Sequence, residues 1–249
     1  MRTYFDLLYA GEQVLDLYLP EEEDFDLFIY FHGGGLEKGD KKDASKFAND
    51  LTSLGIGVVS VNYRMYPNAQ YPEFIEDAAS AVAWVKENIG NYGVCKRTFL
   101  GGSSAGGYLS MMLCFDDRYL GRYGIDPASF AGYIHDAGQP TAHFKVLKES
   151  GVDSRRVIVD ERAPIFFVGL QERYAPMLFV VSDQDMKCRY EQTMLMIETL
   201  RHFDHGEQIS LRVMSGRHCA YLRQTDENGK NLFGSIVSSY ILNEKGKSL

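Results

Sequence analysis

The chain has 249 residues, enough for one α/β domain with a substantial buried core, and its 45% hydrophobic and 24% charged residues exclude wholesale disorder. Its net charge of −8 disfavours a surface that binds nucleic acid or an anionic membrane. Residues 1–20 carry acidic side chains and no long apolar run, so we expect neither a signal peptide nor a membrane span. The four cysteines form no C-x-x-C pair, which indicates free thiols in a cytoplasmic protein.

Apolar runs bounded by turns predict strands, and runs with helical periodicity predict helices. The expected strands are residues 3–9, 12–19, 25–31, 56–61, 98–102, 130–134, 177–182 and 208–214. The expected helices are residues 44–54, 73–89, 108–115, 189–203 and 232–242. Strands that alternate with helices predict a mostly parallel sheet covered on both faces, in one domain.

A stretch of small residues lies between the strand expected at 98–102 and the helix that follows it. It contains the frame Gly-x-Ser-x-Gly, with Gly102 and Gly106 around Ser104. The frame centred on Ser103 fails, because an alanine stands where its last glycine should be. A sharp strand-to-helix turn holds its central side chain in a strained, exposed conformation above a helix N-terminus, which suits a nucleophile. The alternative is a flexible Gly/Ser linker, but the flanking strand and helix favour Ser104 as the nucleophile.

Three consecutive glycines, residues 33–35, follow the strand expected at 25–31. Their backbone N–H groups are covered by no side chain, so the loop can direct donors at one oxygen. Beside a nucleophile turn this predicts an oxyanion hole, to which the N–H of Ala105 adds a donor, although an ordinary flexible turn is the alternative. We expect His32 to brace the loop rather than to take part in the chemistry.

A serine nucleophile needs a base, and the base needs a supporting carboxylate. Asp183 and Asp185 follow one expected strand and His218 follows the next, which gives the chain order serine, acid, histidine at strand ends. We choose Asp185, because it lies further past the strand; Asp183 suits a local role in ordering the loop. The other histidines fit less well: His135 and His143 precede the acid, and His202 and His205 lie at a helix end.

Other features predict no further chemistry. No phosphate-binding, dinucleotide, zinc or calcium motif is present, so we expect neither a cofactor nor a metal. Cys219 lies beside the proposed base, and we interpret it as a buried neutral thiol. Tyr63, Tyr66 and Tyr71 are expected to pack a loop, the alternative being that one of them lines a pocket.

With these residues the sequence resembles the α/β-hydrolase-fold serine esterases, near the hormone-sensitive-lipase-like and small acetyl-esterase group. The segments that carry the resemblance are His32 to Gly35, Asn62 to Pro72 with Asp77, Gly102 to Gly107, and Asp185 with His218. The resemblance implies a single α/β-hydrolase domain over residues 1–249 with a small cap or none. The only sizeable lid candidate lies within residues 137–174.

The resemblance also implies the site residues. They are a triad of Ser104, Asp185 and His218, and an oxyanion hole formed by Gly34, Gly35 and Ala105. The sequence departs from the hormone-sensitive-lipase pattern at Ser103, where an acidic residue is usual. The long N-terminal cap of that group is also missing, which predicts a more open substrate site.

We therefore predict a cytoplasmic serine carboxylesterase that hydrolyses short-acyl esters, such as acetylated sugars or small aryl esters, through an acyl-enzyme. One alternative is an amidohydrolase of the arylformamidase type, which uses the same groups on an N-formyl amide. The other is a catalytically silent hydrolase fold that only binds. The expected partner is a small-molecule ester, with no nucleic acid and no membrane. An exposed N-terminal edge strand would permit a homodimer.

Overall fold

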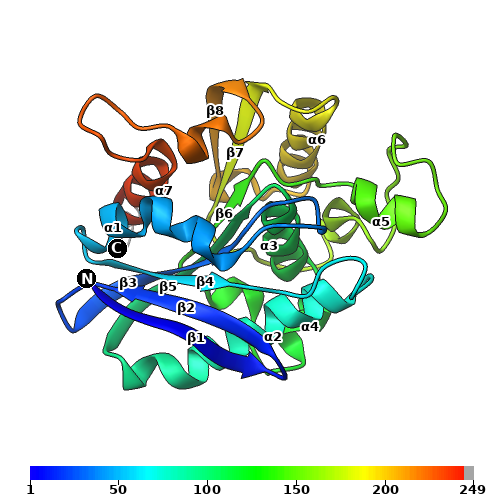
Figure 1. The fold of residues 1–249 in the computed structure, drawn as a ribbon. Helices are drawn as coiled ribbons and strands as arrows, with labels where there is room; N and C mark the ends of the chain where they lie inside the picture. Colours follow the sequence, from blue (N-terminus) through cyan, green and yellow to red (C-terminus); the bar gives the residue numbers. More distant parts are fainter. Residues whose placement is uncertain (244–249) are drawn as a thin grey trace.

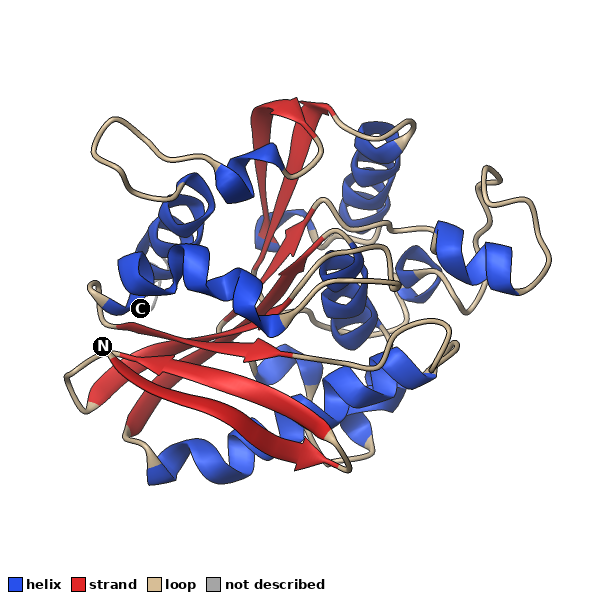
Figure 2. Cartoon of the chain, in the orientation of Figure 1, coloured by secondary structure: helices blue, strands red, loops and turns tan. Residues whose placement is uncertain are grey.

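The computed structural model describes residues 1–243, whose strands form one eight-stranded sheet with helices on both faces (Figures 1 and 2). The strands lie in the order β1-β2-β4-β3-β5-β6-β7-β8. Their bounds are β1 Arg2–Ala10, β2 Gln13–Leu19, β3 Asp24–Phe31, β4 Ile56–Val61, β5 Val94–Ser103, β6 Gly132–Asp136, β7 Met177–Gln184 and β8 Ile209–Arg217. β1 and β2 pair antiparallel, and the strands from β4 to β8 run parallel. The predicted mostly parallel sheet is thus confirmed.

The helices form one layer on each face of the sheet. The α-helices are α1 Ser45–Thr52, α2 Glu73–Asn88, α3 Ala105–Phe115, α4 Asp117–Gly121, α5 Phe144–Glu149, α6 Arg189–His202 and α7 Leu232–Asn243. Short 3₁₀ helices are η1 Lys41–Ala44, η2 Ile89–Asn91, η3 Pro127–Ser129, η4 Pro164–Phe167, η5 Gly206–Gln208 and η6 Ala220–Arg223. α1 and α7 share one buried cluster with the sheet, and α2, α3 and α6 share the other (Figure 1).

Alternation along β3 divides its side chains between these two layers. Leu27, Ile29 and Phe31 pack with α2 and α3, whereas Phe28 and Tyr30 pack with α1 and α7. All five side chains are buried, because successive residues of a strand point to opposite faces and both faces are covered. The continuous apolar run in the sequence therefore reflects a central strand.

Several observed elements differ from the predicted ones: α3 begins three residues earlier than predicted, and β7 and β8 end two and three residues later. β5 begins at Val94 rather than at residue 98, because the charged Arg97 extends the strand by an ion pair at 2.9 Å to Asp26 of β3. β6 runs from Gly132 to Asp136, so it begins and ends two residues later than predicted; the apolar Phe130 lies before the strand and packs on the Tyr133 ring. The prediction also missed α4 and α5, whose few turns give little periodicity.

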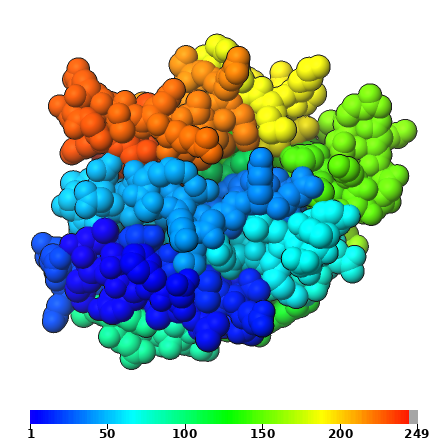
Figure 3. All heavy atoms as spheres, viewed as in Figure 1, coloured from blue at the N-terminus to red at the C-terminus, as the bar shows by residue number. Residues whose placement is uncertain are grey.

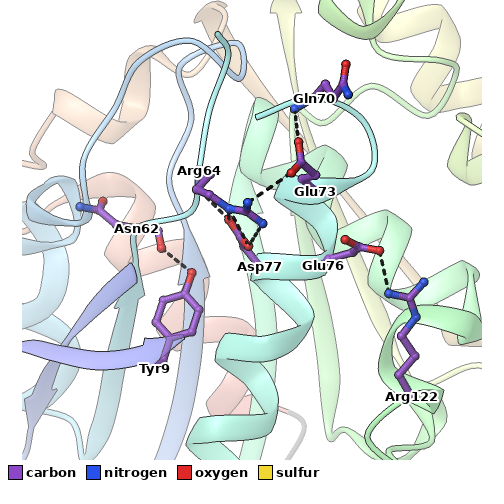
Figure 4. A network of polar contacts seen from close by, with 8 residues as sticks. All are labelled: Tyr9, Asn62, Arg64, Gln70, Glu73, Glu76, Asp77 and Arg122. Atoms are coloured by element: carbon purple, nitrogen blue, oxygen red, sulfur yellow. Dashed lines mark hydrogen bonds and ion pairs between the residues drawn. The ribbon is translucent and has the colours of Figure 1, made fainter. Parts of the chain in front are cut away.

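An arginine fixes the loop between β4 and α2 (Figure 4). The Arg64 guanidinium donates to both carboxylate oxygens of Asp77, with contacts of 2.8 and 2.9 Å, and reaches Glu73 at 3.2 Å. At the start of the loop, the Tyr9 hydroxyl donates to the Asn62 carbonyl at 2.7 Å. The loop is therefore held by α2 through Arg64 and by β1 through Asn62. Tyr63, which lies between these two residues, is thereby fixed in position.

The parallel strands bring distant segments together at their carboxyl ends. Figure 3 shows the segment after β3, in blue, next to the segment after β8, in orange, on one face of the molecule. Both follow strands whose carboxyl ends meet at the same edge, where ligands bind in open parallel sheets. That edge is where the candidate site residues lie.

Candidate active site

Ser104 stands alone between the last residue of β5 and the first residue of α3. Its backbone has φ 56° and ψ −111°, a region that residues other than glycine rarely adopt. Its N–H donates to the Asp136 carbonyl at 2.7 Å, which ties the turn to β6. A Cβ at Gly106 would lie 1.9 Å from the Phe31 carbonyl oxygen, so only glycine lets α3 start this close to β3. The Gly-x-Ser-x-Gly pattern thus has a steric cause.

The structure brings Ser104, His218 and Asp185 together in one chain of hydrogen bonds. His218 follows β8, and its Nε2 lies 2.8 Å from the Ser104 Oγ. Its Nδ1 lies 2.5 Å from Oδ1 of Asp185, which follows β7. One ring nitrogen therefore faces the hydroxyl and the other faces the carboxylate, an arrangement in which the imidazole can take the serine proton.

The surroundings of Asp185 favour its ionised form. Its side chain is only 1% exposed, and this burial alone raises the carboxyl pKa. The hydrogen bond from His218, the His218 charge and the N–H groups of Met186 and Ser182 outweigh burial, so the pKa of Asp185 lies below its usual range. A carboxylate ionised at neutral pH can stabilise the imidazolium that forms when His218 takes a proton.

The carboxylate of Asp183, two residues before Asp185, has a different hydrogen-bond partner. Its Oδ1 accepts a hydrogen bond from the N–H of Gly216 at 2.8 Å. Gly216 precedes His218 by two residues, so this contact holds the end of β7 against the strand that carries the imidazole. Asp183 thereby orders the loop.

The glycine loop between β3 and η1 faces Ser104. A Cβ at Gly33 would lie 3.3 Å from the Ser104 Cβ, which places the two backbones side by side. Gly34 has φ 120° and Gly35 has φ 68°, so the loop needs conformations that favour glycine. Ala105 is the first residue of α3, whose N-terminus carries free N–H groups and a partial positive charge. Gly34 and Gly35 line the same cavity as Ser104, and Ala105 follows Ser104 directly in the chain.

His32 braces this loop from behind. Its ring stacks on Tyr63 with the centroids 4.5 Å apart, and its Nδ1 lies 2.8 Å from the Gly33 carbonyl oxygen. The Tyr63 hydroxyl donates to the His32 carbonyl at 2.8 Å. Burial lowers the pKa of His32, so the ring stays neutral. The expected bracing role of His32 agrees with these contacts, and Tyr63 connects the loop to the segment that Arg64 fixes.

A cavity of about 800 Å³ opens in front of Ser104. The glycine loop, Phe144 of the lid candidate, and residues after β8 line it. Cys219 also lines it, with its Sγ 3.7 Å from the His218 Nε2, and burial raises the pKa of its thiol. The thiol of Cys219 is therefore neutral, as expected, but the residue is half-buried rather than fully buried.

The remaining histidines of the middle segment are structural. His135 is buried in β6 and contacts the Ser110 hydroxyl at 2.9 Å, and burial lowers its pKa to about 3. His143 caps α5, where its Nδ1 accepts from the N–H of Lys145. Within residues 1–243, no group of three or more His, Cys, Asp or Glu side chains is arranged to hold a metal ion.

Two polar residues behind the site were not singled out from the sequence. Asp136 ends β6, and its buried carboxylate accepts a hydrogen bond from the hydroxyl of Tyr221 in η6. A polar residue at the end of an apolar strand was the only available signal for Asp136. Tyr221 gave none, because its partner is 85 residues away.

Solved structures identify the fold. Esterase B from Lactobacillus rhamnosis superposes with a TM-score of 0.78 over 99% of this chain and 87% of its own, at 16% identity. A thermophilic esterase, Est2, from Thermogutta terrifontis superposes with a TM-score of 0.76 over 98% and 92%, also at 16% identity. The chain has the α/β-hydrolase fold.

Part of the chain also matches esterases in sequence. Residues 15–120 match the model of the BD-FAE family. Esterase LipI from Mycobacterium tuberculosis is 35% identical over 105 residues, which are 41% of this chain and 32% of that protein. A 3-O-acetylpapaveroxine carboxylesterase, CXE2, from Papaver somniferum is 31% identical over 118 residues, 39% of this chain and 38% of that protein.

These sequence matches have a limited extent. The chain spans about a third of the length of the curated relatives that it matches. The family model covers the glycine loop and Ser104 but ends before Asp185 and His218. In the described part of the α/β-hydrolase-fold chain, no helix has the length and apolar character needed to cross a membrane.

Proposed function

We propose that the chain is a serine carboxylesterase with Ser104 as nucleophile, His218 as general base and Asp185 as supporting acid. The observation that carries the proposal is the continuous hydrogen-bond chain from Ser104 Oγ through His218 to Asp185, with distances of 2.8 and 2.5 Å. The names of the relatives, which are esterases, support the same reaction class.

In the proposed reaction, the Ser104 Oγ attacks the ester carbonyl carbon while His218 Nε2 takes the hydroxyl proton. Asp185 keeps the other ring nitrogen protonated and stabilises the imidazolium. The N–H groups of Gly34, Gly35 and Ala105 bind the oxyanion of the tetrahedral intermediate. The imidazolium then protonates the leaving alcohol, and an acyl-enzyme remains on Ser104.

Hydrolysis of the acyl-enzyme uses the same groups in reverse order. His218 takes a proton from water, the hydroxide attacks the acyl carbonyl, and the Ser104 oxygen leaves with the proton from His218. The carboxylic acid is released and the free serine is restored. No group beyond the chain's own side chains and water is needed for this balance of protons.

We propose short-acyl esters, such as acetylated sugars or small aryl esters, as substrates. Propionate-bound and butyrate-bound forms of the Thermogutta terrifontis esterase indicate short acids in a site of the same fold. The cavity before Ser104 mixes charged side chains with apolar ones, which suits an alcohol part that carries hydroxyl groups. The free cysteines of the described residues support a cytoplasmic location, and we propose a single domain over residues 1–249.

The test is hydrolysis of p-nitrophenyl acetate, butyrate and octanoate by the wild type and by Ser104→Ala. We expect activity that falls with chain length and a loss of roughly 10⁴-fold or more in kcat for the variant. A fluorophosphonate probe should label the wild type at Ser104 and leave the variant unlabelled. Wild-type turnover by Ser104→Ala would refute the mechanism. A folded, labelled wild type without esterase activity would point to a formyl amide, and an unlabelled one to a binding role.

A further inference from the structure

A buried carboxylate lies directly behind the nucleophile turn. Asp136 is the last residue of β6, and the strand register makes it the Cα partner of Ser103, the residue before the nucleophile. Its side chain is shielded from solvent, with 0% of the residue exposed. Its Oδ1 accepts a hydrogen bond from the Tyr221 hydroxyl, and the Ser103 hydroxyl also faces it.

Asp136 contacts Ser104 directly and is linked to the segment that carries His218 through Tyr221. Its backbone carbonyl accepts the Ser104 N–H at 2.7 Å, so the strained turn rests on this residue. Its carboxylate holds Tyr221, which comes three residues after His218. Tyr221 is 1% exposed, whereas Arg223 after it is exposed, so Tyr221 anchors the segment that carries the imidazole.

We propose that Asp136 is a positioning residue of the proposed triad, whose carbonyl holds Ser104 and whose carboxylate, through Tyr221, holds His218. The proposal rests on the proposed function, because it assigns a second support to the same nucleophile and base. Asp136 itself touches no reacting atom. Its effect is on the distance between the hydroxyl and the imidazole, and small errors in such distances lower turnover strongly.

The electrostatics of Asp136 support a role in function rather than in folding. Burial raises the pKa of its carboxyl to about 6, while the Ser103 and Tyr221 hydroxyls and the charge of His218 act in the opposite direction. Asp185 raises the Asp136 pKa further. A carboxylate ionised at neutral pH in this place is unfavourable for the fold, and asparagine would fill the same space without the charge. A group that opposes folding at a site is commonly retained for activity.

The test is a double-mutant cycle with Asp136→Asn, Tyr221→Phe and both together. We expect each single variant to lower kcat on p-nitrophenyl acetate by about 10- to 100-fold, with KM changed by less than about threefold. The double variant should lose no more than about threefold beyond the worse single variant, because both changes act on one contact: Tyr221→Phe removes its donor and Asp136→Asn replaces its charged acceptor with a weaker, neutral one. The rate of fluorophosphonate labelling at Ser104 should fall in parallel, since it depends on the same pair of groups.

Tyr133→Phe is the matched control. Tyr133 is a fully buried tyrosine at the other end of β6, and its hydroxyl donates to the Pro127 carbonyl at 2.9 Å. Its variant should lose stability and keep the wild-type kcat per folded molecule. If Asp136→Asn does not fold, the kcat of Tyr221→Phe is compared with that of Tyr133→Phe. A loss in Tyr221→Phe alone supports the positioning role, and equal kcat values overturn it.

The outcomes separate this proposal from the proposed function. Wild-type kcat and labelling rates in both Asp136→Asn and Tyr221→Phe would overturn the positioning role and leave the esterase proposal standing. Additive losses in the double variant would also overturn it, because the two residues would then act separately. A wild type that neither hydrolyses the ester nor labels at Ser104 would overturn both.

Discussion

The stability of the Asp136→Asn variant relative to the wild type should rise with pH. Burial raises the pKa of this carboxyl from 3.8 to about 6. A raised carboxyl pKa means that the folded state binds the proton more tightly than the unfolded chain. The stability that this gives is present below the unfolded pKa and is lost as pH rises from there through the folded pKa.

The size of the effect follows from the two pKa values. A change from 3.8 to about 6 corresponds to roughly 3 kcal/mol of unfolding free energy between the acid and alkaline limits. About 1.4 kcal/mol of this falls between about pH 5 and about pH 8. Asparagine carries no titratable group, so the variant does not lose this unfolding free energy as the pH rises. The variant minus wild-type difference in unfolding free energy should therefore rise by about 1.4 kcal/mol across that interval.

The assay is urea unfolding followed by circular dichroism at both pH values, for wild type, Asp136→Asn and the control Tyr133→Phe. The control removes no carboxyl, so its difference from wild type should be independent of pH. The electrostatic reasoning would be refuted if the unfolding free energy of Asp136→Asn minus that of the wild type stays constant or decreases as pH rises. The expected combination is a stability relative to wild type that rises with pH, together with a lower kcat.

Two further predictions concern residues around Ser104. Asp185→Asn should lower kcat by roughly 10⁴-fold, whereas Asp183→Asn, which keeps an oxygen that can accept the Gly216 N–H, should lower it by less than about tenfold; similar losses in p-nitrophenyl acetate hydrolysis would contradict the choice between them. Gly34→Ala would place a Cβ 1.8 Å from a backbone carbonyl oxygen and should lower kcat by about 100-fold or more, while Gly35→Ala meets only an aromatic ring at 3.4 Å, strains a residue with φ 68°, and should lower kcat less. Wild-type kcat in Gly34→Ala would show that the loop does not supply the oxyanion donors.

The fold could be predicted from the sequence where a signal is local. β4 was predicted with its observed bounds, Ile56–Val61, because a strand buried on both faces is a continuous β-branched run. The turn at Ser104 was predicted because the glycines that permit it are adjacent in sequence. Asp185 and His218 could be selected because parallel strands deliver their carboxyl ends to one edge.

The missed features depend on pairing between distant segments. The role of Asp136 follows from the register of β5 with β6 and from a hydroxyl that belongs to η6. No local pattern encodes which residues of two strands face each other. The short helix α5 was missed for a different reason, since its six residues are too few to show helical periodicity, although Val146 and Leu147 are buried in the core. A homodimer remains a prediction.

The base and the nucleophile occupy unequal places in the sheet. Ser104 follows β5, which has a strand on each side, whereas His218 follows β8, an edge strand whose residues are mostly half-buried or exposed. Edge strands open at lower free energy than central ones, because fewer contacts must break. Low concentrations of denaturant should therefore detach the imidazole while the centre of the sheet stays folded. The esterase activity that we propose would be lost, reversibly, before the chain unfolds.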